Sequence, residues 1–437
     1  MRSFNAGIPG QKRRVALSLL MIVIAASNPM VPMTVSNAAV ADSLKTDFGV
    51  YAEPPLQPLP QAGAKITDPV FGTTVLRLTD GSQGGTRCNV SYATIPVFNV
   101  NSTRAYVRCD PFAIARFFQF NPTTFSASSG TTIPSPPINL KQFWMIWSGT
   151  NPDVTYGNNG AAIYAYNVAT QSMTTVLNAG QILAAGERLN YQMSKSENDD
   201  VFADTFDGSS ENIGYVVWRR SDNKVLLKQY ESADEVEIDK TGRYLIVSFT
   251  GGSVRVWDLQ TTSTLLNPAP PGYGFVHRGL GHGTAFTWIP GGSGTLGYRA
   301  LATPTLITKL LPDSSWSYTD QQDHFSMLAD NELWALASRY STTGSGVVKA
   351  FDNEILQVAT DGSLRVRRFA HHRSVVQDNY YATPMANISR DGRFVAFTSN
   401  WGTATGRVDV YIVQVPPISS STPDTTPPAT PTSLRVQ

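Results

Sequence analysis

A recurring unit of roughly 40 to 60 residues most constrains what this chain can fold into. Each copy has a polar approach, an apolar strand, a turn rich in Asp, Asn or Gly, and then two more strands. The clearest copies are VEIDKTGRYLIVSF at residues 236–249 and ANISRDGRFVAFTS at residues 386–399. Repetition at this spacing is typical of propellers and solenoids.

Weaker copies of the unit fill the rest of the chain. They begin at Ala93, Trp144, Tyr191, Thr284 and Phe325. Each first strand leads through a tight turn into an alternating or apolar second strand, as expected where neighbouring blades cover both faces of a sheet. With the two clear copies, the sequence predicts an all-β, seven-bladed propeller.

The last copy lacks one strand, because a Pro-rich stretch begins directly after Val415. The segment TTVLRLTD at residues 73–80 precedes the first complete copy and has the pattern of an outermost strand. We expect it to pair beside residues 408–415 and to close the ring, which would remove exposed sheet edges.

Composition agrees with one globular β domain. Hydrophobic residues make up 41% of the chain and charged residues 15%, which favours a large core over a disordered chain or a coiled coil. A propeller repeats a single unit, so we assign residues 66–415 to one domain after a Pro-rich segment at 42–65. The Ser, Thr and Pro-rich tail at 416–437 is expected to be disordered. Its end, PPATPTSLRVQ, resembles the start of a fibronectin type III module.

Residues 1–41 have the pattern of a secretory signal peptide. Four basic residues precede an apolar run at 15–26, and a small-residue stretch ends at Ala41, where we expect cleavage. The run is shorter than the roughly 20 residues of a membrane span, although an uncleaved anchor remains the alternative. The protein is therefore expected to be secreted, extracellular or periplasmic, without a span after cleavage.

Net charge and cysteine content limit the classes of binding partner and indicate the cellular compartment. Removing the segment takes away four basic and no acidic residues, so the formal charge changes from +1 to −3. Without a basic excess, nucleic acid is not an expected partner. The two cysteines, Cys88 and Cys109, flank a predicted strand–turn–strand and predict one disulfide, with free buried thiols as the alternative.

The candidate site follows from propeller geometry. Loops that lead into the innermost strands meet at one rim of the central channel, although they are far apart in sequence. Aromatic, amide, acidic and imidazole groups at such a rim suit sugar rings and their hydroxyls. The candidates are Asn89, Tyr92, Gln142, Arg188, Asn190, Glu235, His282, His324, Tyr380 and Tyr381.

All five histidines lie in the C-terminal half, at positions 277, 282, 324, 371 and 372. Imidazole is the commonest metal ligand, so His282 and His324, with Glu235, are candidates for a divalent ion such as Mn²⁺ or Ca²⁺. The alternative is that these are loop histidines that cap backbone groups. The basic stretch at residues 365–373 is interpreted as a solvated outer strand, with binding of a carboxylate ligand as the alternative.

The phrases SRDGRFVAFTSNWG and EIDKTGRYLIVSF resemble the turns and strands of Tol-type and oligogalacturonate-lyase-type propellers, over most of residues 66–415. VRVWDL also resembles a WD-repeat strand. Gly281 with His282, and then His324, are similar to the lyase pattern, which implies a His-rich metal set completed by Gln and a separate His as base for β-elimination. The chain departs from that pattern at DNYYATPMANIS, which has no His and leaves only Gln377 nearby.

Three functions are compatible with these observations. The first is a secreted binding module for carbohydrate or another envelope component at the channel mouth. The second, implied by the resemblance, is a metal-assisted polysaccharide lyase acting on uronates. The third is a scaffold for protein partners. No nucleophile elbow, phosphate loop or dinucleotide fingerprint is present in the sequence to indicate other chemistry.

Overall fold

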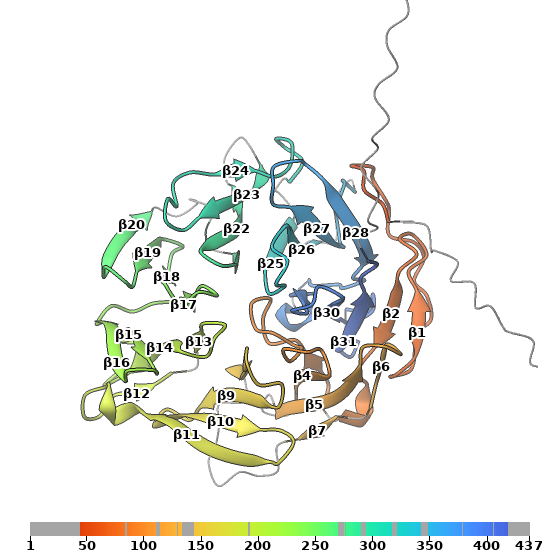
Figure 1. Ribbon diagram of the computed structural model, residues 1–437. Coiled ribbons are helices and arrows are strands. Elements are labelled where there is room, and N and C mark those ends of the chain that lie inside the picture. Colours follow the sequence, from red (N-terminus) through yellow and green to blue (C-terminus); the bar gives the residue numbers. More distant parts are fainter. Residues whose placement is uncertain are drawn as a thin grey trace, which may run out of the picture. The chain divides into compact units, whose positions relative to one another are not determined.

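Seven antiparallel sheets lie around a central axis, as the sequence predicts (Figure 1). The computed structural model describes residues 44–83, 85–110, 114–128, 130–132, 144–190, 193–269, 275, 277–289, 294–316, 321–341, 348–377, 379–404 and 406–417. The expected signal peptide and nearly all of the tail, including its fibronectin-like end, lie outside these residues.

Each blade runs from an innermost strand to an outermost strand. Blade 1 consists of β3 (Cys88–Asn89), β4 (Arg104–Cys109), β5 (Ile114–Asn121), β6 (Ser126–Ala127) and β7 (Thr131–Thr132). Blade 2 consists of β8 (Ile146–Trp147), β9 (Val154–Asn158), β10 (Ala162–Asn167) and β11 (Ser172–Asn178). Blade 3 consists of β12 (Arg188–Leu189), β13 (Ser194–Lys195), β14 (Val201–Asp207), β15 (Gly214–Arg219) and β16 (Lys224–Gln229).

The second half of the chain repeats the same plan. Blade 4 consists of β17 (Glu235–Ile238), β18 (Tyr244–Ser248), β19 (Val254–Asp258) and β20 (Ser263–Ala269). Blade 5 consists of β21 (Arg278–Leu280), β22 (Thr284–Ile289), β23 (Thr295–Ala300) and β24 (Thr308–Lys309). Blade 6 consists of β25 (Gln321–Ser326), β26 (Trp334–Ser341), β27 (Glu354–Ala359) and β28 (Val366–His371). Short 3₁₀ helices occur at η1 (Gly81–Gln83), η3 (Ala179–Gln181) and η5 (Tyr380–Ala382).

Blade 7 joins the two ends of the propeller. Its sheet has the order β1-β2-β31-β30-β29, made of β29 (Asn387–Ile388), β30 (Phe394–Ser399), β31 (Asp409–Gln414), β2 (Thr74–Arg77) and β1 (Lys65–Thr67). Val75 pairs with Val413 and Leu76 with Ile412, in antiparallel register. The predicted closure by an N-terminal strand is confirmed, and β1 adds a further strand outside it.

The core lies between blades, because alternate side chains of one strand face opposite neighbours. All five residues of β18 are buried. Leu245 and Val247 pack with Val217 of blade 3, whereas Tyr244 and Ile246 pack toward blade 5. The predicted disulfide is confirmed: Cys88 and Cys109 are bonded across β3 and β4.

The basic stretch is buried from residue 366 to residue 373, and only Arg365 at its start is exposed, which corrects the expectation of a solvated outer strand. Arg368 is fully buried and forms an ion pair with Glu354 of the neighbouring strand. Its Nη1 also donates to the carbonyl oxygen of Gly49 at 2.7 Å, and Tyr51 O lies 2.9 Å from Nε2 of His371. The N-terminal segment from Leu44 onward therefore covers this strand.

Candidate functional site

The two ends of the central channel are built by different parts of each blade. The loop mouth is the end where loops lead into the innermost strands, and the turn mouth is the end where tight turns lead into the second strands. Between them lies a cavity of about 140 Å³ lined by residues from all seven blades. Each innermost strand thus presents one end to each mouth.

The loop mouth has a second cavity, of about 480 Å³. Such a volume lies within the range that small-ligand sites occupy. Aromatic rings, imidazoles, amides and a hydroxyl surround it, contributed by Tyr92, His277, Gln322, His324, Tyr340, Val376, Asn379, Tyr380 and Thr383.

Four rings pack together in the wall of this cavity. The His324 ring stacks between His277, with centroids 4.5 Å apart, and Tyr340, at 5.7 Å, while Tyr92 meets it edge-on at 5.2 Å. Burial lowers the pKa of His324 well below its usual range, and the nearby His277 adds to the effect. His324 is therefore a neutral packing ring at physiological pH.

His277 differs from its stacking partner because an acid lies beside it. The Oδ1 atom of Asp323 is 3.6 Å from His277 Nδ1, and Trp316 Nε1 donates to the other carboxylate oxygen at 2.7 Å. Burial alone would lower the pKa of His277, but the carboxylate of Asp323 outweighs it and raises that pKa. Of the two stacked imidazoles, His277 is the one that can carry a proton near neutral pH.

Two glutamates lie below these rings, on β17. Glu235 and Glu237 are two residues apart on one strand, so their side chains share a face. Arg278 of blade 5 forms an ion pair with Glu237, and its Nη2 lies 3.7 Å from Glu235 Oε2. Burial raises the pKa of Glu235 to about 7, and the charge of Glu237 adds to this rise.

Exposed tyrosines complete the loop mouth. The side chains of Tyr380 and Tyr381 are 59% and 38% exposed, in the short helix η5 that precedes blade 7. The guanidinium of Arg87 lies 3.3 Å from the ring centroid of Tyr381, and that of Arg108 lies 6.0 Å from it. The cationic groups orient Tyr381, while much of Tyr380 remains accessible.

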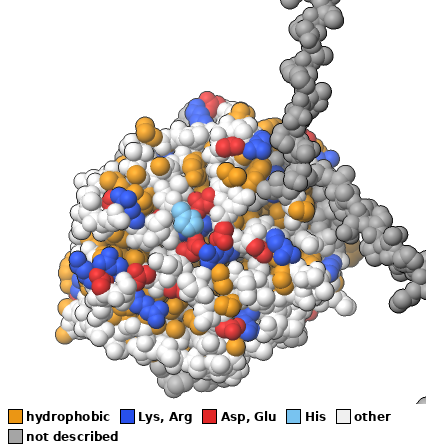
Figure 2. Space-filling model, in the orientation of Figure 1, with side chains coloured by type: hydrophobic (Ala, Val, Ile, Leu, Met, Phe, Trp, Pro, Cys, Tyr) orange, Lys and Arg blue, Asp and Glu red, His pale blue; other side chains and the backbone are white. Residues whose placement is uncertain are grey.

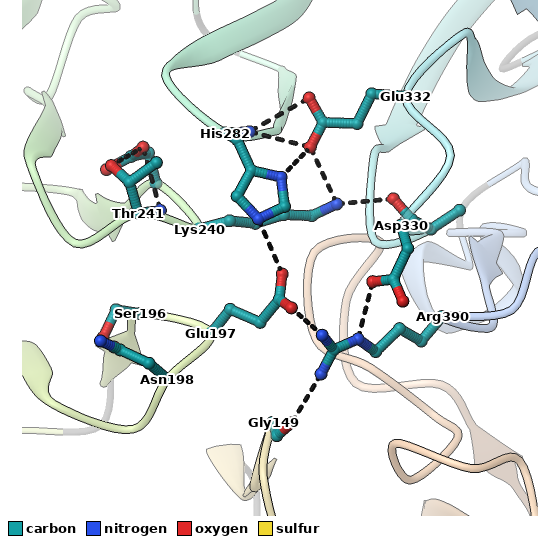
Figure 3. Close-up of polar contacts among 12 residues, drawn as sticks. Gly149, Ser196, Glu197, Asn198, Lys240, Thr241, His282, Asp330, Glu332 and Arg390 are labelled. Carbon is teal, nitrogen blue, oxygen red and sulfur yellow. Dashed lines mark hydrogen bonds and ion pairs between the residues drawn. The ribbon is translucent and has the colours of Figure 1, made fainter.

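The turn mouth carries a network of charged groups instead of rings (Figure 3). Glu197 of blade 3 forms an ion pair with Arg390 of blade 7, and its Oε2 lies 3.2 Å from His282 Nε2 of blade 5. His282 Nδ1 lies 2.7 Å from Glu332 Oε1 of blade 6, and Lys240 Nζ of blade 4 lies 3.1 Å from the same oxygen. Figure 2 shows acidic, basic and histidine side chains gathered near the centre of one face.

Backbone hydrogen bonds link the same turns. Glu197 N donates to the carbonyl oxygen of Lys240 at 3.0 Å, and Lys240 N donates to that of Gly281 at 3.2 Å. Arg390 also reaches Asp330 Oδ1 at 2.7 Å and Gly149 O of blade 2 at 2.5 Å. Six of the seven blades therefore contribute to one polar network across the channel.

The structure brings part of the predicted site together. Tyr92, Glu235 and His324 surround a narrow gap without room for a water molecule, and Tyr380 lines the adjoining cavity, with Tyr381 beside it. Asn89 is buried in β3, where Arg108 Nε donates to its Oδ1 at 3.2 Å.

Arg188 and Asn190 contact Asp207 of their own blade instead of the loop-mouth cavity. Asn190 Nδ2 donates to Asp207 Oδ1 at 2.7 Å, and Arg188 Nε lies 3.3 Å from the other oxygen of the same carboxylate. Neither residue lines the cavity or the narrow gap at the loop mouth. Gln142 lies outside the described residues.

The prediction that His282 and His324 share one mouth is wrong. The copy of the repeat assigned at Thr284 begins with the second strand of blade 5, because the innermost strand is β21 (Arg278–Leu280). His277 precedes β21 and stacks on His324, whereas His282 follows β21. The two predicted metal ligands therefore lie at opposite ends of the channel.

The described residues do not fit a divalent metal site. A metal binds imidazole in the plane of the ring, and the planes of His277 and His324 are inclined by only 21°, so their nitrogen lone pairs do not converge. No group of three or more His, Cys, Asp or Glu side chains in the described part of the chain is arranged to hold an ion. His371 and His372 instead contact the carbonyl oxygens of Tyr51 and Arg339, as the capping alternative expects.

Several residues of the loop mouth were missed from sequence. Glu237 shares the strand face of Glu235, so period-two alternation was a usable signal. His277 and Arg278 were missed because their strand is only three residues long. Asp323 and Tyr340 lie just outside the copy predicted from Phe325 onward, because β25 begins at Gln321 and β26 extends to Ser341.

Comparison with known proteins supports the architecture. No protein-family model and no curated protein matches the sequence. An oligogalacturonate lyase in complex with manganese superposes with a TM-score of 0.58 at 11% identity, over 82% of this chain and 97% of that chain. A second oligogalacturonate lyase, from Vibrio parahaemolyticus, gives 0.57 at 10% identity, over 82% and 99%. These likenesses show a shared propeller fold.

A TolB from Acinetobacter baumannii aligns over 63% of this chain and 65% of its own, at 16% identity. Its TM-score of 0.37 is too low to support an inference.

Proposed function

We propose that this protein is a secreted propeller that binds carbohydrate, or an envelope component that carries it, at the loop mouth. The observation that carries the proposal is the 480 Å³ cavity walled by tyrosines, imidazoles and amides. Sugar rings present apolar C–H faces that pack on aromatic rings, and hydroxyls that bond to amide and imidazole groups.

The accessible groups match those two requirements. Tyr380 offers an exposed ring at the edge of the cavity, next to Asn379. Gln322 accepts a hydrogen bond from the Tyr340 hydroxyl at 3.2 Å, which leaves its NH₂ group to donate to a ligand. The chemistry of the mouth therefore favours a neutral, hydroxyl-rich ligand that stacks.

The described residues do not support a metal-assisted lyase. That function was expected from a His-rich metal set, and the histidines of the described chain do not converge on one point. The fold alone does not select a function, because one propeller architecture hosts many.

A role outside the cytoplasm is part of the proposal. The Cys88–Cys109 disulfide supports it, since such bonds persist in oxidising compartments. Within the described residues, no helix has the length and apolar character needed to cross a bilayer. A processed N-terminus after Ala41 in protein recovered from the culture medium or periplasm would support this part directly.

A glycan array followed by titration of the best ligand tests the binding proposal. We expect Tyr380→Ala to weaken binding about tenfold, because a stacked ring contributes about 1 kcal/mol or more. Tyr230→Ala is the matched control, because this tyrosine is 64% exposed but does not line the cavity. His282→Ala at the turn mouth should also leave binding unchanged.

Two results would overturn the proposal. One is an array without binding to any glycan, and the other is equal weakening by the Tyr380 and Tyr230 variants. Circular dichroism of each variant would show that its fold is retained.

A further inference from the structure

The middle of the channel is apolar, although both of its ends are charged. The 140 Å³ cavity extends from Glu235 and Glu237 at one end to Glu197, Lys240 and Arg390 at the other, and between them it receives an apolar side chain from every blade. Blade 6 contributes Leu328, and the other six blades contribute Ile95, Ile146, Met193, Ile238, Leu280 and Ile388. Trp144 and Trp147 of blade 2 widen the same apolar wall.

The polar side chains around this section already bond within the protein. Lys195 Nζ lies 2.6 Å from Asp199 Oδ1, and Ser148 Oγ donates to the same carboxylate at 2.5 Å. Ser194 Oγ accepts a hydrogen bond from Ile238 N at 3.0 Å. A polar ligand, or water, would gain few hydrogen bonds there, whereas an apolar group would lose none.

We propose that this section binds a hydrocarbon group of about the size of a benzene ring. A dry cavity of about 150 Å³ lined by Leu, Ile and Phe accepts benzene or xenon, and the present cavity is close to that volume. The alternative, a water-filled channel, requires two to four polar partners per water molecule, and the apolar belt itself supplies none.

Both ends of the apolar section are narrow, so such a group enters through a local opening of side chains. At one end, Glu235 and Glu237 line the apolar cavity and also a gap beneath His277 and His324 that has no room for a water molecule. At the other end, the contacts of Glu197 with Arg390 and His282 cross the channel. The site goes beyond the proposed carbohydrate function and does not depend on it.

Titration with toluene, followed by NMR spectroscopy, and xenon-pressurised crystals test the inference. We expect saturable shifts that include resonances of Trp144 and Ile388, and xenon density on the channel axis. Leu280→Phe, which fills the cavity, should weaken toluene binding about tenfold or more. Leu265→Phe on the outermost strand β20 is the matched control and should bind as the parent does.

Absence of saturable toluene binding, or a parent crystal with ordered water and no xenon in the channel, would overturn the inference. The xenon measurement uses the unaltered protein, so it decides the matter even where Leu280→Phe fails to fold. Because neither probe contains a sugar, failure here would leave the glycan result standing, and the reverse holds too.

Discussion

The two mouths of one channel use the same strands for opposite purposes. At the turn mouth, polar side chains of five blades and a backbone carbonyl of a sixth contact one another, and Glu197 reaches both Arg390 and His282. At the loop mouth, rings line an open cavity, and His324 Nδ1 has no hydrogen-bond partner among the described residues.

The difference follows from the lengths of the connections. Tight turns between first and second strands hold their side chains close to the axis, where six of them meet and satisfy each other. The longer loops that lead into the blades leave room between them, and the cavity lies there. We infer that the turn mouth contributes stability and that the loop mouth contributes recognition.

Glu197→Ala should produce the largest loss of stability, because Glu197 is the acid that joins blades 3, 5 and 7. Its side chain and that of Arg390 are only about one-fifth to one-quarter exposed, so we expect a loss of about 1 to 3 kcal/mol in the free energy of unfolding. Urea denaturation measures it. Glu231→Ala is the control, since Glu231 pairs with Arg255 at 43% exposure and should cost below about 1 kcal/mol. Equal losses would erase the distinction between the mouths.

Glu235→Gln at the loop mouth should change the pH dependence of stability. The pKa of Glu235 is about 7 in the folded protein and 4.5 ordinarily, so the folded state holds a proton that the unfolded state has released between these values. Stability therefore falls as pH rises from about 4.5 to about 7. The variant has no such carboxyl group. Between pH 4 and pH 8, its free energy of unfolding should therefore rise by about 1 to 3 kcal/mol relative to that of the parent. Parallel pH profiles of the two proteins would contradict this account.

His324→Phe should change stability by less than about 1 kcal/mol, because a neutral ring of similar shape replaces a neutral ring. The pKa of His324 lies well below its usual range, so no charge is lost at neutral pH. Thermal denaturation at pH 7 measures the change. A loss well above that value would mean that the imidazole nitrogens have a role that ring packing does not explain.

Manganese should leave the thermal stability of the protein unchanged. A ligand present at 100 times its dissociation constant stabilises a protein by about 2.7 kcal/mol, so occupied sites are readily detected. We expect the melting temperatures in Mn²⁺ and in EDTA to agree. A saturable rise with Mn²⁺ would show a site that the described donors do not form, and it would restore the lyase hypothesis.

The sequence predicted the fold far better than the site. The strands at residues 236–249 and 386–399 could be predicted because their apolar residues lie on both sides of a Gly-containing turn. The closing strand could be predicted because the last repeat lacks one strand and the strand at residues 73–80 belongs to no other repeat. Both features are local patterns that the propeller then repeats.

Predicting the site required the exact ends of the innermost strands, where the hydrophobic pattern is weakest. β21 has three residues, Arg278 to Leu280, and shows no alternation, so the repeat in blade 5 was assigned one strand too late. That shift moved His282 to the wrong mouth and concealed His277. The burial of Arg368 was equally hidden, because its partners Asp47 and Gly49 lie more than half the chain away.

The pairing of Val75 with Val413 also sets the order of events during biosynthesis. β2 leaves the ribosome about 340 residues before its partner β31, so closure of the ring waits for all of the intervening chain, which is made at about 5 to 20 residues per second. A nascent chain of this protein therefore keeps its closing seam unpaired for tens of seconds.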